Sequence, residues 1–297
     1  MKMPFADFHC DTLTVLLENE GNLFENSLNF DAKYAKNFTK IFETFAIFIP
    51  ENLGKTEARE YYKRNIDYFY NLLSKNSDTV KLVKSAEDLE ENGKIKIMLS
   101  IENFSFIDEK EIENVFSDGV RIASLSWNSD NSIVGGAYGT GRLSERAKEL
   151  IKYMEKTGLT LDISHLNFDS ANAALDISKR PVAATHSSSF SLRESPRNLT
   201  DELYLKVAKS GGVAGVNFHR DFIGEDANAA AVARHIDRFY KLSPTAVVFG
   251  SDFDGADMPF GIEGLKDMDI IFAEMENLGI SAENLYKNAI EFLKRIL

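Results

Sequence analysis

Five residues of this sequence carry metal-binding side chains and stand at the ends of short apolar runs. They are His9 and Asp11 in FHCDT, Glu102 after IKIMLSI, His165 after LTLDIS and His186 after PVAAT. Imidazole nitrogens and carboxylate oxygens are the ligands that zinc and similar divalent ions take in catalytic sites. A carboxylate can also bridge two ions, which then share one water, lower its pKa and polarise a carbonyl group. The set predicts hydrolysis of an uncharged amide or ester bond.

Taken one at a time, these residues are weak signals. A histidine at the end of a strand is commonly a hydrogen-bonded structural residue, and H-x-D tripeptides arise by chance. The prediction rests on suitable side chains at several separate strand ends, which Asp252 joins after TAVVFG. His235 lies inside a helix that we expect at 225–242, and we interpret it as structural.

Short apolar runs alternate with amphipathic stretches along the whole chain. We expect strands at 5–9, 43–49, 95–101, 119–125, 159–164, 181–185, 212–217 and 245–250. The clearest helix is expected at 144–157, where Ser144 can cap the N-terminus and Gly158 can end the helix. Such alternation is typical of parallel βα units.

Eight strands are the number that closes a (β/α)8 TIM barrel, and one such domain needs about 250 residues. A doubly wound open sheet gives the same alternation, so periodicity leaves both folds open. In a barrel, the C-terminal ends of the strands form the active site, so the metal-binding candidates would meet at one rim. No linker interrupts the chain, and we expect a single metallo-hydrolase barrel over residues 1–297.

The composition argues against several classes of protein. Lys and Arg total 34 against 46 Asp and Glu, and a net charge of −12 disfavours non-specific binding to nucleic acid. The single cysteine, Cys10, excludes an internal disulfide and suits a reducing compartment. No apolar run has the length of a signal peptide or a membrane span. We therefore expect a cytoplasmic protein with no nucleic-acid or membrane partner.

Longer motifs surround these residues and follow one another along most of the chain. They are FHCDT (8–12), SIENF (100–104), SLSWNSDN (124–131), GLTLDISHLN (158–167), PVAATHSSS (181–189), SPRNLTDE (195–202), GGVAGVNF (211–218) and FGSDFDG (249–255). In this order they resemble the membrane dipeptidase family (renal or microsomal dipeptidase-like, peptidase family M19), a branch of the binuclear-metal barrel hydrolases. The run from DISH to SDFDG is the most specific part of the resemblance.

The resemblance implies two divalent metal ions, with zinc as the expected metal. His9 and Asp11 match the pair that binds one metal, Glu102 matches the bridging carboxylate, and His165 and His186 match the imidazoles on the second metal. The implied reaction is hydrolysis of dipeptides, including L-D or dehydro dipeptides, by a metal-activated water. A homodimer is the common assembly in this family.

The resemblance also implies two residues that act on the substrate. Arg197 in PRNLTDE matches the arginine that holds the C-terminal carboxylate of the substrate, to which a planar guanidinium is suited. From the sequence alone, Arg197 could equally be a surface residue in a loop. Asp252 matches the eighth-strand aspartate, which passes a proton to the leaving amine and contacts the free amino group.

Two positions depart from the family pattern. Many members have a histidine after the fourth strand, in L-T-H-N, where Trp127 stands here. The indole N–H of Trp127 could donate to a developing oxyanion, or Trp127 could be a packing residue at the barrel mouth. His219 stands where the vertebrate enzymes have tyrosine, and we expect it to line the pocket without binding metal. Both departures concern the choice of substrate more than the type of reaction.

Two alternative functions stay open. A hydrolase on the same scaffold could act on N-acyl amino acids, lactones or phosphoesters, although the sequence contains no evident phosphate-binding loop. A non-catalytic metal-binding homologue could also keep the scaffold. The presence of all five candidate ligands together with Asp252 argues against that second alternative.

Overall fold

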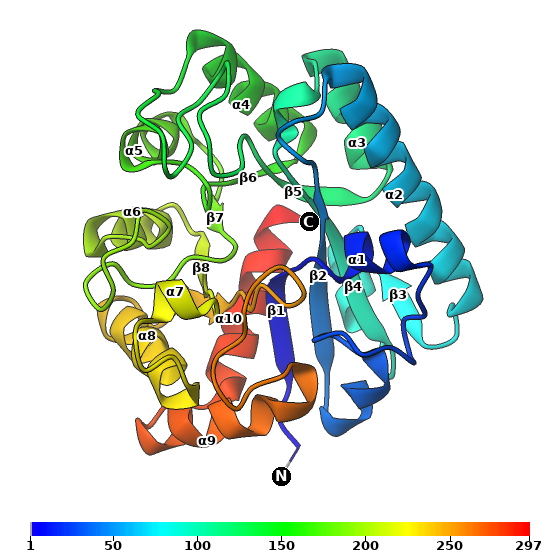
Figure 1. Cartoon of the computed structure of the whole chain (residues 1–297), viewed down its shortest axis with the longest axis vertical. Coiled ribbons are helices and arrows are strands. Elements are labelled where there is room, and N and C mark those ends of the chain that lie inside the picture. The colour runs from blue at the N-terminus through cyan, green and yellow to red at the C-terminus, as the bar shows by residue number, and fades with distance from the viewer. Residues whose placement is uncertain (1) are drawn as a thin grey trace.

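A closed parallel sheet forms the centre of the computed structural model, which describes residues 2–297. The strands are β1 (Phe5–Cys10), β2 (Ile41–Phe48), β3 (Val80–Leu82), β4 (Ile95–Glu102), β5 (Val120–Ser124), β6 (Thr160–Asp162), β7 (Ala183–Ala184), β8 (Val213–Val216) and β9 (Val247–Phe249). Their order is β2-β1-β9-β8-β7-β6-β5-β4-β3, and β2 also pairs with β4. That pairing closes eight strands into a (β/α)8 TIM barrel (Figure 1). The predicted barrel is confirmed, and the open sheet is excluded.

Each of the eight predicted strands is present, although several are shorter than expected. The prediction missed one strand, β3, which pairs with the first half of β4 through Val80 and Ile95. The second half of β4 pairs instead with β5, from Leu99 and Val120 onward. The short VKL segment (80–82) therefore takes the place of β5 beside the N-terminal half of β4. Three residues, one of them a lysine, give too weak an apolar pattern for recognition from the sequence.

Helices connect the strands and surround the barrel. They are α1 (Thr12–Asn19), α2 (Lys55–Lys75), α3 (Ile112–Ser117), α4 (Glu145–Thr157), α5 (Phe168–Ile177), α6 (Asp201–Lys209), α7 (Arg220–Ile223), α8 (Ala229–Leu242), α9 (Met268–Asn277) and α10 (Ala282–Ile296). Helix α4 begins and ends as predicted, because the Ser144 side chain accepts from the N–H of Ala147 and Gly158 adopts a φ of 97°. Within the described chain, no helix is long and apolar enough to cross a membrane.

The helix expected over 225–242 begins later than predicted. Its first residue is Ala229, because the side chain of Asn228 accepts from the N–H of Ala231 and caps the helix there. The preceding residues belong to the loop that follows α7. The apolar stripe of α8 indicated a helix correctly, but the cap decides where that helix starts.

The N-terminal end of the barrel is filled by apolar side chains and covered by α10. One buried cluster contains a residue from each of seven barrel strands: Ala6, Phe42, Met98, Ile122, Ala183, Val213 and Val248. Strands on opposite sides of the barrel can share a cluster only in its interior. The same cluster contains Phe292 of α10, whose ring lies 5.6 Å from that of Phe8. Figure 1 accordingly shows α10 at the centre of the ring of outer helices rather than within that ring.

Candidate active site

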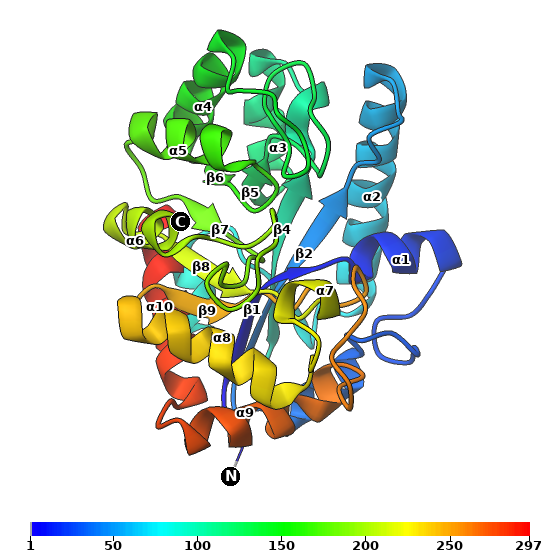
Figure 2. The same cartoon turned by 60° about the vertical axis from the view of Figure 1, so that its left-hand side comes forward.

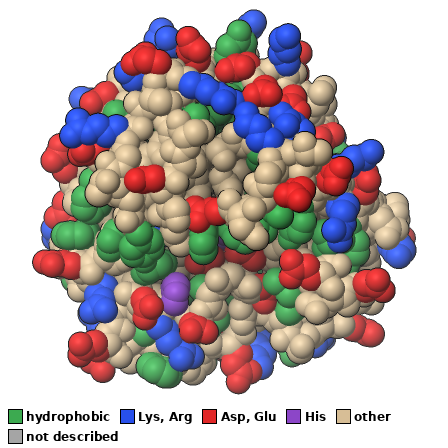
Figure 3. Space-filling model, turned by 45° about the horizontal axis from the view of Figure 1, so that its top comes forward, with side chains coloured by type: hydrophobic (Ala, Val, Ile, Leu, Met, Phe, Trp, Pro, Cys, Tyr) green, Lys and Arg blue, Asp and Glu red, His purple; other side chains and the backbone are tan. Residues whose placement is uncertain are grey.

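A cavity of about 500 Å³ opens at the C-terminal end of the barrel. Its lining includes His165, His186, Arg197 and Asp252, together with residues from α1, α2 and α7. Figure 3 shows acidic side chains in and around a hollow near the middle of one face of the molecule. A volume of this size is typical of sites for small molecules.

The strand ends bring the predicted ligands to this cavity. His9 lies near the end of β1, Asp11 is the N-cap residue of α1, and Glu102 is the last residue of β4. His165 and His186 follow β6 and β7 by two or three residues. The rule that the active site of a barrel lies at the C-terminal ends of its strands therefore predicted this convergence correctly.

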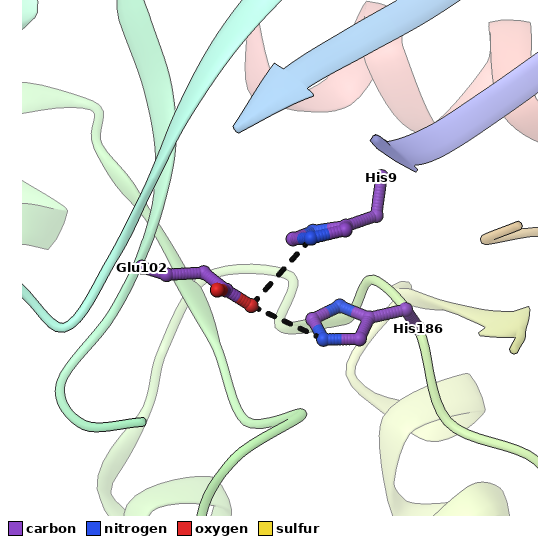
Figure 4. A group of neighbouring side chains, drawn as sticks. All are labelled: His9, Glu102 and His186. Atoms are coloured by element: carbon purple, nitrogen blue, oxygen red, sulfur yellow. Dashed lines mark ion pairs between the residues drawn. The ribbon is translucent and has the colours of Figure 1, made fainter. Parts of the chain in front are cut away.

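Glu102 lies at the centre of the cluster. Its Oε1 atom is 2.7 Å from Nε2 of His165, 3.2 Å from Nε2 of His186 and 3.5 Å from Nε2 of His9. Figure 4 shows His9 and His186 pointing toward this same carboxylate oxygen. One carboxylate oxygen thus faces three imidazole nitrogens, and all four side chains are almost completely buried.

His9 also belongs to a second, more acidic group. Its Nε2 atom lies 3.5 Å from Oδ2 of Asp11 and 3.7 Å from Oδ1 of Asp252. The ligand atoms of His9, Asp11 and Asp252 lie within 4.8 Å of one another, as do those of His9, Glu102 and His186. His9 is therefore shared between two potential metal sites.

The hydrogen bonds behind the two remaining histidines fix their tautomers. His165 Nδ1 faces the side-chain oxygen of Asn128 at 3.1 Å and must donate to it. His186 Nδ1 lies 2.8 Å from the hydroxyl of Thr185, whose own proton goes to Asp162 at 2.5 Å, so this Nδ1 also donates. Each neutral ring then presents the lone pair of Nε2 to the cavity. The two Nε2 atoms are only 2.8 Å apart.

The protonation states agree with these contacts. Burial alone would raise the pKa of Glu102, but the neighbouring imidazole groups of His165 and His9 hold it well below its usual value. Burial alone would lower the pKa of His9, but Glu102, Asp11 and Asp252 together raise it to about 10. Burial lowers the pKa values of His165 and His186. Glu102 is therefore ionised and His165 and His186 are neutral, as metal ligands must be, whereas His9 is protonated and would have to release its proton to bind a metal.

Several features of the cluster fit divalent cations. The Nε2 lone pairs of His165 and His186 face each other at 2.8 Å, where they repel, and Arg197 offers a hydrogen bond to that of His165 alone. His9 Nε2 and Asp11 Oδ1 are buried without any hydrogen-bond partner, which is costly for polar atoms. A Cβ atom on Gly255 would lie 2.0 Å from Oδ2 of Asp11 and 2.8 Å from Oδ1 of Asp252, so only glycine keeps this space open. The donor set of imidazole and carboxylate suits zinc and similar metals.

The backbone is strained at the same strand ends. Asn103, Asp252 and Asp254 adopt φ values of 63°, 62° and 65°, in the left-handed region that non-glycine residues rarely occupy. Asn103 directly follows Glu102, and the other two follow β9. Conformations of this kind cost about 1–3 kcal/mol each and cluster at functional sites. These conformations turn the chain sharply after β4 and β9, where Glu102 and Asp252 reach the cavity.

Asn217 orients the carboxylate of Asp252. The amide Nδ2 of Asn217 donates to Oδ2 of Asp252 at 2.9 Å, and the Asp252 N–H donates to the carbonyl of His9 at 3.1 Å. The other oxygen of Asp252 faces His9. Asp252 is 8% exposed, so one of its oxygens is held by the protein while the side chain still borders the cavity.

Arg197 lies deep in the cavity and is 3% exposed. Its guanidinium donates to the carbonyl of Ser164, and Nη2 lies 3.1 Å from Nε2 of His165. Within residues 2–297 it forms no ion pair with a carboxylate. Burial lowers the pKa of Arg197, because the charged form loses its hydration. The alternative that Arg197 is a surface loop residue is wrong. Asp252, Glu102 and Asp162 are near enough to favour its charged form, but no carboxylate of the described chain pairs with it directly.

Trp127 and His219 line the cavity but stand outside the metal cluster. The half-buried ring of Trp127 packs edge to face on Phe48, at 5.3 Å between centroids, and lies 6.3 Å from the ring of His165. The ring of His219 lies 4.7 Å from that of Phe222, and its buried Nδ1 has no hydrogen-bond partner. Trp127 therefore both packs at the barrel mouth and faces the site.

His235 is structural in its contacts, as the sequence suggested. Its Nδ1 accepts from the N–H of Ser189 at 3.0 Å, and its Nε2 lies 3.1 Å from the carbonyl of Ile223. It is 2% exposed and does not line the cavity. Burial lowers its pKa to about 4, so the ring is neutral. Its hydrogen bonds connect α8 to the loop that contains Ser189 and to the end of α7 at Ile223.

The residues whose hydrogen bonds orient the ligand side chains were not predicted from the sequence. Asp162 ends β6 and accepts from Ser164 and Thr185, while Asn217 follows β8 directly. Both could have been found by the strand-end rule that identified the histidines. Asn128 gave no such signal, because it lies in a loop whose path the sequence does not reveal.

Comparisons with known proteins agree with this architecture. The family model for membrane dipeptidases (peptidase family M19) matches residues 1–297. The uncharacterized dipeptidase C965.12 of Schizosaccharomyces pombe is 35% identical over 221 residues, which cover 68% of this chain and 52% of that protein. Dipeptidase verJ of Clonostachys rogersoniana is 28% identical over 76% of this chain and 61% of its own length. The chain spans about half the length of the first of these relatives.

Solved structures show the same fold. A metallo peptidase from Rhodobacter sphaeroides, liganded with a phosphinate mimic of the dipeptide L-Ala-D-Ala, matches with a TM-score of 0.92 and 22% identity over 100% of both chains. The dipeptidase AC, a metallo peptidase of family M19, matches with a TM-score of 0.91 and 23% identity over 99% of both chains. Because the family model matches the full length of the sequence, this chain belongs to the membrane dipeptidase family, peptidase family M19.

Proposed function

We propose that this protein is a metal-dependent dipeptidase, which hydrolyses the amide bond between two amino acids. The observation that carries the proposal is the buried Arg197 guanidinium, which has no carboxylate partner in the described chain and shares a cavity with the histidine–carboxylate cluster. A buried charge without a partner is costly unless a ligand supplies one. A free C-terminal carboxylate is such a ligand, and a guanidinium can bind both of its oxygens.

We propose two divalent metal ions at the cluster, with zinc as the expected metal. His9, Asp11, Glu102, His165 and His186 would hold them, with Glu102 between the two sites, as its contacts to three histidines suggest. Bound there, the ions would polarise the substrate carbonyl and lower the pKa of a water molecule. His165 Nδ1 donates to the side-chain oxygen of Asn128 and His186 Nδ1 donates to the hydroxyl of Thr185, and these bonds keep both Nε2 lone pairs directed at the site.

Asp252 is proposed as the residue that moves the proton. Asn217 holds one of its carboxylate oxygens, while the other faces the cluster near His9. A carboxylate positioned in this way can take a proton on the side where water is activated and release it to the leaving amine. Its place at the edge of the cavity also allows contact with the free amino group of the substrate.

Trp127 and His219 are proposed to contact the substrate rather than the metal. Trp127 presents a rigid aromatic surface above His165, and its indole N–H is a donor that can serve a developing oxyanion. The unpartnered Nδ1 of His219 provides a polar contact beside Phe222. Both residues would then influence which substrate side chains the cavity accepts.

Two further properties are proposed on the same basis. The single cysteine, Cys10, is buried and free, which supports a reducing compartment such as the cytoplasm. We propose a single catalytic domain over residues 1–297, and a homodimer as the assembly to test by light scattering. Neither property affects the chemistry proposed above.

The proposal is tested by comparing the hydrolysis rate of a dipeptide with that of its C-terminal amide, which lacks the carboxylate. The purified protein, loaded with zinc, is expected to hydrolyse L-Ala-L-Ala and L-Ala-D-Ala, and dialysis against a chelator should abolish turnover reversibly. The C-terminal amide of the same dipeptide should react at least about a hundredfold more slowly, because Arg197 loses its ionic partner. Preference for an N-acyl amino acid over every dipeptide, or metal binding without any amide hydrolysis, would reject the dipeptidase assignment.

A further inference from the structure

The cavity lining carries more negative charge than the proposed reaction uses. Its lining residues include six carboxylates and one arginine. Asp11, Glu102 and Asp252 belong to the cluster, and Asp254 is satisfied by the hydroxyl of Thr12 and the backbone N–H groups of Asn29 and Phe30. The two carboxylates that remain are Glu18 and Asp221, both exposed at the mouth. Within residues 2–297, neither forms an ion pair.

Glu18 is placed by the helix that continues from the metal cluster. One face of α1 forms a wall of the cleft. The residues on this face follow one another at helical spacing, and all of them line the cavity: Asp11, Thr14, Val15 and Glu18. Figure 2 shows α1 extending outward from the end of β1. At 1.5 Å per residue, Glu18 lies about 10 Å beyond Asp11 along the helix axis. The hydroxyl of Tyr61 donates to Oε1 of Glu18 at 3.2 Å and holds it over the cleft.

Asp221 lies on the side of the cleft where Arg197 is buried. The ring of its neighbour Phe222 stands 5.4 Å from the guanidinium carbon of Arg197. Asn198 donates to the carbonyl of Phe222 at 2.9 Å, which ties α7 to the loop that carries Arg197. Arg193 donates to the backbone carbonyl of Asp221, not to its carboxylate. The carboxylate of Asp221 therefore stays free beside the predicted site of the substrate's C-terminal residue.

We infer that this cleft selects dipeptides with a long cationic side chain, that of lysine or arginine. Asp221 recognises the side chain of the C-terminal residue, whose carboxylate is held on Arg197, and Glu18 recognises that of the N-terminal residue, which lies toward α1. The inference rests on the proposed dipeptidase function. Because an extended dipeptide spans only about 7 Å, a long side chain is needed to reach a carboxylate at the rim.

The expected preference is modest and depends on salt. Ion pairs between partly exposed groups give a discrimination of up to about fivefold. Salt screens such pairs, since the Debye length falls from about 10 Å at 0.1 M to about 3 Å at 1 M. A preference that arises from these carboxylates must therefore shrink as the ionic strength rises, whereas a preference that arises from shape would not.

Arginine and citrulline form a matched pair of probes, because they have nearly the same shape and differ in charge. For the metal-loaded protein, kcat/KM for Ala-Arg should exceed that for Ala-citrulline by about three- to fivefold, and Arg-Ala should exceed citrulline-Ala by a similar factor. Asp221→Asn should bring only the first ratio toward one, and Glu18→Gln only the second. Glu225→Gln removes the same charge from an exposed position outside the cavity lining and should change neither ratio.

The outcomes separate this inference from the proposed function. Hydrolysis of all four dipeptides with both ratios near one, at low and at high salt, would overturn the inference and leave the dipeptidase function standing. A charge preference that persists unchanged in Asp221→Asn and Glu18→Gln would also overturn it. If no dipeptide is hydrolysed, the dipeptidase function is rejected. The dissociation constants of the same four peptides are then measured by calorimetry, and the arginine peptide of each pair is compared with its citrulline counterpart.

Discussion

The two ends of the barrel bury opposite kinds of side chain, although the same strands supply both. Strand β1 gives Ala6 to the apolar cluster at the N-terminal end and His9 to the site at the C-terminal end, and β4 gives Met98 to one and Glu102 to the other. The apolar end gains about 1.5–3 kcal/mol for each large side chain that it buries. The polar end buries charges and strained backbone, which cost stability. The barrel thus separates the residues that stabilise it from the residues that do chemistry.

This separation has a consequence for variants. A change at the polar end should alter activity with little loss of folding stability, and a change at the apolar end should do the reverse.

The largest effect is expected for Asp252→Asn. The substitution keeps the hydrogen bond with Asn217 possible but removes the group proposed to move the proton, so kcat should fall by about 10²–10⁴-fold. Metal content, measured by atomic absorption, should stay near that of the unaltered protein. Asp257→Asn, in the same loop but exposed and outside the cavity lining, is the matched control and should keep full activity. Unchanged turnover in Asp252→Asn would exclude the proposed role.

At the other end of the barrel, Phe292→Ala should affect stability instead. Phe292 is completely buried against Phe8, and its truncation should lower the free energy of unfolding by about 3–5 kcal/mol. Urea denaturation measures this change, and kcat of the folded protein at 25 °C should stay close to that of the unaltered chain. Phe260→Ala, at a phenylalanine that is 59% exposed, is the control and should cost far less. A large loss of kcat with normal stability would show that the two ends are not independent.

The smallest effect concerns His235, a buried polar residue near the mouth that serves stability. Its pKa is about 4 in the folded protein against about 6.5 when unfolded, so its contribution is complete above pH 6.5 and is lost as the pH falls toward 4. The loss amounts to about 3 kcal/mol over that window. In His235→Asn, whose side-chain oxygen can still accept from Ser189, the free energy of unfolding should fall less between pH 7 and pH 4.5.

The measurement for His235 is a comparison of urea midpoints at the two pH values. Other groups titrate alike in both proteins, so the difference between the proteins isolates this histidine. Equal pH dependence in the two proteins would mean that His235 is already solvated in the native state.

The sequence alone was enough to predict parallel βα units and the identity of the proposed ligands. The period of its apolar runs predicted eight strands, and polar side chains at the ends of those runs pointed to His9, Asp11, Glu102, His165, His186 and Asp252. Both inferences depend on local patterns, which a strand or a helix imposes on consecutive residues. For the same reason, Ser144 and Gly158 marked the ends of α4 correctly.

The tertiary structure specifies how these residues are arranged in space. It closed the sheet through the pairing of β2 with β4, which are separated by more than forty residues, and so excluded the open sheet. It also buries Arg197, whose exposure the sequence left open. The tertiary structure places Asn128 in hydrogen-bond contact with His165, and Asn217 in hydrogen-bond contact with Asp252. It also set Glu18 and Asp221, from α1 and α7, at one mouth. Such contacts join residues far apart in the chain, and no local periodicity encodes them, because they depend on how the whole barrel closes.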